Sequence, residues 1–314
     1  MPHITFIHGI SNKPAENKLK QIWLDALAND LLNNGDGLDL GAMGVTTSMI
    51  YWADVLYAKP EEILKEAVAN LESTEEVAGK SEADPDMSWR DTITDEEKKM
   101  VDSLAAKLSF DLLVNDDYRP DEKDVAKTLE RIPLPWFIKR RIMKWLLKDV
   151  HHYLFNQEFS PASGITYKVQ EEIRSRVLKK LNEVQSDRHI VVSHSMGTII
   201  MYDCLKRVAE CPAIDGLMTV GSPLGIDEVQ DKFAPEWTRA NGFPEKVKGP
   251  WINVYDTLDP VTGFDGNIAN DYKRNGEEVI EVINEQNWGS WRHNITNYFS
   301  EPKLRAALLN MLNL

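Results

Sequence analysis

The sequence predicts an α/β fold in which a mostly parallel sheet of about six strands is covered by helices on both faces. Short apolar, β-branched runs alternate with amphipathic helical patterns, the order typical of parallel strands joined by crossover helices. Residues 189–208 have the pattern of a buried strand, a tight turn and a helix. Residues 58–160 are helix-rich and contain no clear strand, so we expect a helical cap or lid inserted into a single domain spanning 1–314.

The N-terminal part of the chain supplies the first two strands. A short apolar run at residues 4–7 predicts a buried strand, and it leads into His8-Gly9 and a polar loop. An amphipathic pattern over 19–31 predicts the helix that follows. A second strand is expected at 45–52, after a glycine-rich turn.

The turn Ser193-His194-Ser195-Met196-Gly197 is the most informative stretch of the chain. A serine between a strand and a helix is the context of a nucleophile elbow, in which a strained backbone lifts the hydroxyl above the sheet. The positions two before and two after the serine must be small, and Ser193 and Gly197 meet that need. The alternative is an ordinary strand-to-helix turn with Ser195 as N-cap.

The rest of the chain continues the alternation. We expect helices at 163–184 and 302–312, strands at 216–220, 251–255 and 278–283, and a loop-rich segment at 224–250.

A serine nucleophile needs a histidine base that a carboxylate orients, and behind an elbow the chain order is serine, acid, histidine. Of seven histidines, only His293 follows Ser195. The acid is expected after the strand 251–255, where Asp259 is favoured over Asp256 because an aspartate at the strand end often caps a turn. His194 is a less favoured base, because it should point away from the serine.

Two backbone N–H groups are candidates for an oxyanion hole, the pair of donors that stabilises the charge of the transition state. Met196 follows the nucleophile, and Ile10 lies in the loop after the first strand. Without the elbow, His8-Gly9 would be interpreted as an ordinary turn at the end of a strand.

Charge and composition exclude several function classes. The net charge of −14 argues against nucleic-acid binding, which requires a basic surface. Cys204 and Cys211 lack the spacing of a disulfide framework or a metal site, so plain thiols, no metal and no cofactor are expected. No apolar run is long enough for a membrane span, and no signal peptide is recognised. A cytoplasmic protein is the expectation.

The segment 133–148 of the insert interleaves aromatic and basic residues, with Ile138, Ile142, Trp145 and Leu146 on one helical face. One interpretation is a lid or membrane-surface helix that receives lipid, in which Trp136 and Trp145 contact the bilayer. The favoured interpretation is a cap helix that packs its apolar face on the core of its own protein and leaves its basic face in solvent.

These residues resemble the α/β-hydrolase superfamily, specifically its lipase and esterase branch with GPI-inositol-deacylase-like proteins. The resemblance rests on five matching pieces, namely Ile7-His8-Gly9, Val192-Ser193-His194-Ser195-Met196-Gly197, Gly221-Ser222-Pro223, Asp259-Pro260-Val261 and His293. It spans the chain apart from the insert, for which no counterpart is recognised. It implies hydrolysis of acyl esters through an acyl-enzyme without a metal, an acyl pocket shaped by Gly-Ser-Pro, and a reduced sheet of about six strands.

The leading hypothesis is therefore a serine esterase or lipase-like enzyme acting on a small-molecule or lipid ester through Ser195, Asp259 and His293. A thioesterase, amidase or acyltransferase with the same triad is an alternative within enzymes. A catalytically silent binding module, with the insert as its interaction surface, is an alternative from another class.

Overall fold

The computed structural model describes the chain except for residues 30–36, 62–86, 108–135, 263–264 and 289–291, and except for the side chains of 136–142. The strands are β1 (Pro2–Ile7), β2 (Thr46–Ile50), β3 (Glu158–Ala162), β4 (Ile165–Lys168), β5 (Arg188–His194), β6 (Gly216–Val220), β7 (Trp251–Tyr255) and β8 (Glu281–Asn284). The α-helices are α1 (Glu16–Ala28), α2 (Ala53–Leu56), α5 (Asp95–Lys107), α7 (Trp136–Leu154), α8 (Val169–Asn182), α9 (Met196–Arg207), α10 (Asp227–Asp231), α11 (Ile295–Tyr298) and α12 (Pro302–Leu312).

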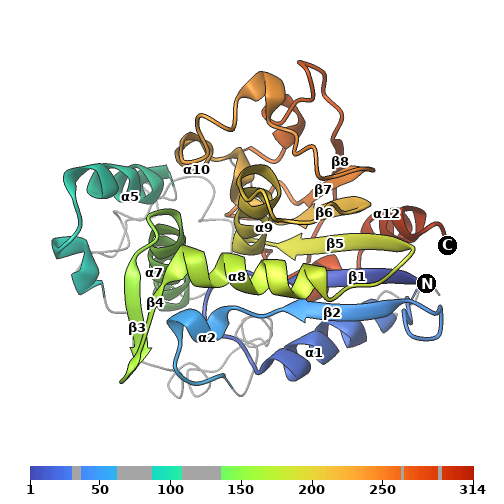
Figure 1. Cartoon of the computed structure of the whole chain (residues 1–314), viewed down its shortest axis with the longest axis horizontal. Helices are drawn as coiled ribbons and strands as arrows, with labels where there is room; N and C mark the ends of the chain where they lie inside the picture. Colours follow the sequence, from blue (N-terminus) through green and yellow to red (C-terminus); the bar gives the residue numbers. More distant parts are fainter. Residues whose placement is uncertain (30–36, 62–86, 108–135, 263–264, 289–291) are drawn as a thin grey trace.

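Six of these strands form one parallel sheet in the order β2-β1-β5-β6-β7-β8 (Figure 1). The α/β class and the six-stranded parallel sheet predicted from the sequence are thus confirmed. Strands β6 and β7 have the predicted bounds, because each is a mostly apolar, buried run between turn residues. All six carboxyl ends lie at one edge of the sheet, where sites form in open α/β folds.

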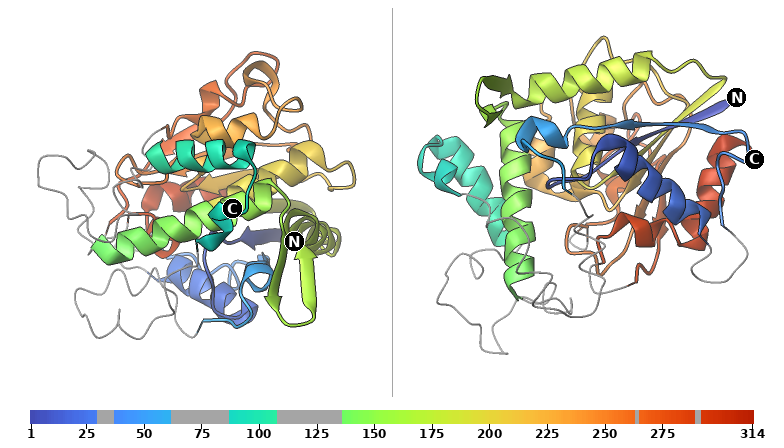
Figure 2. Two further views of the ribbon diagram at one scale, coloured as in Figure 1. Left: turned by 90° about the vertical axis from the view of Figure 1, so that its left-hand side faces the viewer. Right: turned by 90° about the horizontal axis from the view of Figure 1, so that it is seen from below.

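Helices cover both faces of this sheet, and alternate strand residues bury into two cores. Ile190 and Val192 pack with α1 and α12, whereas Val191 packs with α8 and α9. Figure 2 shows α8 and α1 on opposite sides of strands β1 and β2, with α7 standing across the sheet at the end away from the two termini. This end holds the carboxyl edge, so α7 lies beside the region where a site is expected.

One prediction about helix content was wrong. The range 163–184 was expected to be a helix, but its first part is β4, which pairs antiparallel with β3, and α8 begins at Val169. Strand β3 also begins at Glu158, inside the range expected to lack strands. The two short strands turn at Gly164, whose φ is +78°, and they are largely exposed, so they lack the apolar alternation that reveals a strand.

Only part of the insert predicted at 58–160 belongs to the described residues. Its described residues include α5 and most of α7, while 62–86 and 108–135 lie outside the described residues. In α7, Trp145 and Leu146 are buried in the core that also contains α8 and α9. This packing agrees with the favoured interpretation of a helix that packs on its own protein. The side chains of Trp136, Ile138 and Ile142 lie outside the described residues.

Candidate active site

Ser195 lies between β5 and α9, with φ 54° and ψ −129°, an unusual conformation for a residue with a side chain. Its amide donates to the carbonyl of Val220 on β6 at 3.0 Å, which fixes the turn against the neighbouring strand. Such a backbone costs about 1–3 kcal/mol and persists only where its surroundings impose it. Ser195 is fully buried, and its Oγ has no hydrogen-bond partner among the described residues.

Small residues allow this turn to pack against the loop after β1. A Cβ at Gly197 would lie 2.7 Å from the carbonyl oxygen of His8, and one at Gly9 would lie 2.6 Å from Ser195 Cβ. Ser193 is buried and donates its hydroxyl to the carbonyl of Met218 at 3.2 Å, so a serine fits where the usual pattern has glycine. The structure therefore explains why small residues are needed at positions 193 and 197.

His293 lies in the loop before α11, and its imidazole meets the carboxylate of Asp259 after β7. Nδ1 of His293 lies 2.9 Å from Oδ1 and 2.8 Å from Oδ2 of Asp259. A Cβ at Gly221, the residue after Val220, would lie 3.1 Å from Nδ1 of His293. Since Val220 accepts the Ser195 amide, the imidazole and the serine turn both adjoin the carboxyl end of β6.

The Asp259 carboxylate is held by two further donors. The amide of Val261 donates to Oδ1 at 2.8 Å, and the hydroxyl of Tyr298 donates to Oδ2 at 2.9 Å. Burial raises the pKa of Tyr298 well above its ordinary value, so its hydroxyl keeps its proton and acts as a donor. Tyr298 also accepts the amide of Asp256 at 2.9 Å. Tyr298 could not be predicted from the sequence, because it carries no motif and acts through its place on α11.

Of the two candidate aspartates, the structure brings Asp259 to His293 and gives Asp256 a different role. Asp256 accepts the amide of Leu258 at 2.7 Å, as a turn cap does, and pairs with Arg292 at 3.3 Å. Burial raises the pKa of the Asp256 carboxyl. The turn-capping interpretation of Asp256 therefore fits its contacts.

His194 has a supporting position rather than that of a base. Its Nε2 donates to the backbone carbonyl of His293 at 3.0 Å, and the two rings lie 4.7 Å apart. Because a carbonyl can only accept, Nε2 carries the proton of the imidazole. Burial holds the pKa of His194 well below its ordinary value, so the ring stays neutral. His194 thus anchors the loop that carries His293.

The loop expected to hold the oxyanion donor Ile10 is fixed by His8, which is fully buried. The amide of Trp52 donates to Nε2 of His8 at 3.0 Å, so the proton of this imidazole is on Nδ1, which donates to the carbonyl of Gly9 at 2.9 Å. Burial lowers the pKa of His8 to about 3. Ile10 and Met196 are both buried, Met196 directly after Ser195 and Ile10 directly after Gly9, and the direction of their N–H groups stays a prediction.

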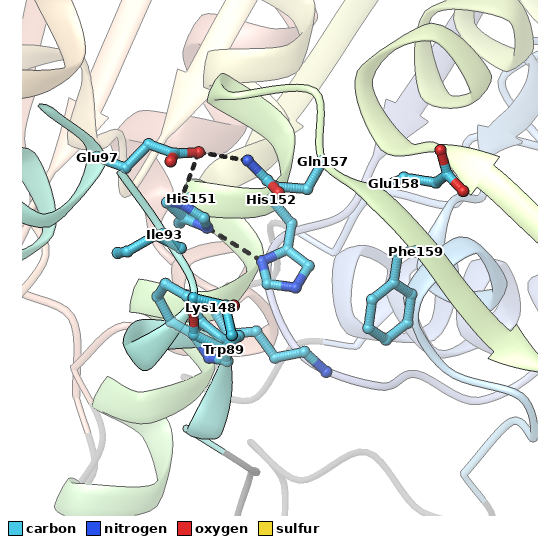
Figure 3. A pocket seen from close by; sticks show the side chains of 10 residues that line it. Trp89, Ile93, Glu97, Lys148, His151, His152, Gln157, Glu158 and Phe159 are labelled. Carbon is cyan, nitrogen blue, oxygen red and sulfur yellow. Dashed lines mark hydrogen bonds and ion pairs between the residues drawn. The ribbon is translucent and has the colours of Figure 1, made fainter. Parts of the chain in front are cut away.

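A cavity of about 330 Å³ lies elsewhere, within the insert (Figure 3). Its walls come from the segment before α5 and from α5, α7 and β3, and they consist of Trp89, Thr92, Ile93, Glu97, Lys148, His151, His152, Gln157, Glu158 and Phe159. Glu97 lies 3.5 Å from Nε2 of His151, and Nδ1 of His151 lies 3.3 Å from Nδ1 of His152. Ser195, Asp259 and His293 do not line this cavity.

The described residues bear on three further expectations, namely a membrane span, membrane contact of 133–148 and a metal site. None of the described helices combines the length and the apolar character needed to cross a membrane. Trp145, one of the two residues expected to contact lipid, is only 5% exposed, and the side chain of Trp136 lies outside the described part, so membrane contact of 133–148 stays a prediction. Within the described part, no group of three or more His, Cys, Asp or Glu side chains is arranged to hold a metal ion.

Neither a scan of the chain against models of known protein families nor a search of curated proteins finds a match. The functional interpretation therefore depends on the geometry of the site alone.

Proposed function

We propose that this protein is a serine hydrolase of the α/β-hydrolase fold that cleaves carboxylic esters through an acyl-enzyme intermediate. One observation carries the proposal. The imidazole of His293, held by Asp259 at 2.8 Å, adjoins the strand end to which the strained turn of Ser195 is bonded. A buried serine turn and an imidazole that a carboxylate orients, brought to the same strand end, fit the arrangement of an activated nucleophile.

In the proposed reaction, Ser195 Oγ attacks the ester carbonyl while Nε2 of His293 accepts the hydroxyl proton. Asp259 binds Nδ1 of His293, which keeps the imidazole in the tautomer that can accept and stabilises the imidazolium that forms. His293 then returns the proton to the leaving alcohol. In the second half it takes a proton from water, whose oxygen attacks the acyl-enzyme and releases the acid.

The backbone N–H groups of Ile10 and Met196 are proposed to bind the oxyanion. Met196 is the first residue of α9, where N–H groups have no partner within the helix. Gly9 supports the role of its neighbour Ile10, because it contacts Ser195 so closely that a Cβ at this position would overlap the serine. One oxyanion donor is worth about 100- to 1,000-fold in rate.

The topology supports the fold assignment. The serine follows β5 in the middle of the sheet, the acid follows β7, and the histidine follows β8 at the sheet edge. This is the chain order serine, acid, histidine expected behind a nucleophile elbow.

A fluorophosphonate probe tests the proposal directly, because it labels only an activated serine. Wild-type protein and a Ser193→Ala control are expected to be labelled, since the Ser193 hydroxyl is bonded to Met218 and lies on the strand before the turn. Ser195→Ala and His293→Ala are expected to lose the label. Absence of label in the wild type, together with no turnover of p-nitrophenyl esters of graded chain length, would favour a catalytically silent binding module.

The same triad could act on thioesters or amides or transfer the acyl group to another acceptor. Hydrolysis of an oxyester, a thioester and an amide with matched acyl chains distinguishes the first two possibilities from ester hydrolysis. Addition of alcohol acceptors, with transfer products measured, tests the third.

A further inference from the structure

The insert helix α7 reaches the candidate site through two side chains on the same face. Asp149 and Tyr153 are four residues apart, so they lie one turn from each other on the helix. Both are fully buried. Asp149 contacts the loop after β1, and Tyr153 donates to Asp203 of α9, the helix that starts after Ser195.

The loop contact of Asp149 falls on a strained residue. Ser11 directly follows Ile10, and its φ of 69° lies in the left-handed region that serine rarely adopts. Its amide donates to Oδ2 of Asp149 at 2.7 Å, and the hydroxyl of Tyr57 donates to Oδ1 at 2.8 Å. A backbone of this kind needs a partner that holds it, and a buried carboxylate is a strong acceptor.

Ile10 therefore lies between two peptide groups that are each fixed by a buried side chain. The carbonyl of Gly9 belongs to the same peptide plane as the Ile10 N–H, and Nδ1 of His8 binds this carbonyl. The amide of Ser11 belongs to the next peptide plane, and Asp149 binds it. Together the two contacts leave the Ile10 N–H little freedom to rotate.

We propose that Asp149 is a positioning residue, which holds the loop so that the Ile10 N–H points at the oxyanion. The proposal rests on the proposed function for its catalytic consequence, whereas the contact itself does not. Since Tyr153 and Arg174 both bind Asp203 at 2.7 Å, α7 is also tied to α9 and α8. The described part of α7 is thus held to two core helices and to the loop after β1.

Asp149→Ala tests the proposal, with Tyr153→Phe as the matched control from the same face of α7. Loss of Asp149 is expected to lower kcat for p-nitrophenyl esters about 10- to 100-fold with KM nearly unchanged, because a misplaced donor weakens binding of the transition state alone. Tyr153→Phe removes a buried contact of α7 without touching the loop, so it should lower the melting temperature and leave kcat within about threefold.

The strain at Ser11 provides a rescue test. Glycine adopts a positive φ without cost, so adding Ser11→Gly to Asp149→Ala should recover part of the lost kcat. Asp149→Asn should retain more activity than Asp149→Ala, because its carbonyl oxygen can still accept the Ser11 amide. Equal loss of kcat in Asp149→Ala and Tyr153→Phe, without rescue by Ser11→Gly, would overturn the positioning role.

Hydrogen exchange at the Ser11 amide separates this proposal from the proposed function. In wild-type protein this amide should exchange slowly, and Asp149→Ala should speed its exchange at least tenfold, while Tyr153→Phe leaves it nearly unchanged. This result is expected even in a protein without hydrolase activity. Fast exchange in the wild type would contradict the contact, whereas slow exchange with no label by a fluorophosphonate would contradict the proposed function alone.

Discussion

Two buried carboxylates, Asp259 at the sheet edge and Asp149 in the insert, hold the parts of the candidate site by different means. Asp259 follows β7 and meets a histidine that follows β8, so the parallel sheet itself brings the two loops together. Asp149 meets Ser11 across 138 residues of sequence, and only the docking of α7 creates this contact. The difference teaches that strand order brings Asp259 and His293 together, whereas the conformation of the loop after β1 depends on the packing of the insert.

Of the variants of the two carboxylates, Asp259→Asn is expected to have the largest effect on turnover. An amide in place of the carboxylate favours the wrong tautomer of His293 and cannot stabilise the imidazolium, so kcat should fall about 10⁴-fold while the fold is kept. Steady-state turnover of a p-nitrophenyl ester measures the loss, and circular dichroism checks the fold.

Asp256→Asn is the matched control for this prediction. Asp256 is equally buried but holds the Leu258 amide and Arg292, so its loss should affect activity less than about tenfold. If Asp256→Asn lowered kcat more than Asp259→Asn, Asp256 rather than Asp259 would be the acid, and strand order alone would not explain how the acid meets His293.

The sheet-edge residues could be predicted because each clue is local or concerns chain order. Apolar runs indicate the strands, a serine between small residues indicates the turn, and His293 is the sole histidine after Ser195. The sequence allowed a choice between Asp259 and Asp256 as the acid only from their distance to the end of the strand. Their contacts settle the geometry, since Asp259 alone of the two binds His293.

The contribution of the insert could not be predicted, because nothing in the sequence near Asp149 indicates its partner. The residues around Asp149 form an ordinary amphipathic helix, and the amide it binds lies in another part of the chain. The hairpin of β3 and β4 was missed for a related reason. Its strands are too exposed to show alternation. They pair through their backbones, and Ser160 and Thr166 add a side-chain contact between hydroxyls.

Acid is expected to lower the folding stability by an intermediate amount. This effect tests whether the sheet edge and the insert respond alike to a fall in pH. Burial lowers the pKa of His8 to about 3, of His151 to about 4 and of His152 to about 3, although Glu97 opposes the shift of His151. The unfolded chain binds these protons near pH 6.5, whereas the folded chain binds them only near pH 3–4. Folding stability should therefore be complete above pH 6.5 and decline as the pH falls toward 4.

Each of these histidines should cost about 1 kcal/mol of unfolding free energy at pH 5.5 relative to pH 7.5. Urea unfolding at the two pH values measures the sum. His152→Gln in the insert should remove one part of the decline, since it removes one proton taken up on unfolding. An unchanged pH dependence in His152→Gln would contradict the assignment of part of the acid sensitivity to His152 of the insert.

The smallest expected effect on stability concerns backbone strain at the candidate nucleophile, Ser195. Ser195 has φ 54°, and glycine adopts such a conformation without the steric cost that a Cβ brings. Ser195→Gly should thus abolish turnover but raise the unfolding free energy by about 1 kcal/mol, with Ser193→Ala as a buried, unstrained comparison that gains nothing. Urea unfolding at neutral pH measures both variants. A loss of stability in Ser195→Gly would mean that side-chain packing of Ser195 stabilises the turn more than its backbone strain destabilises it.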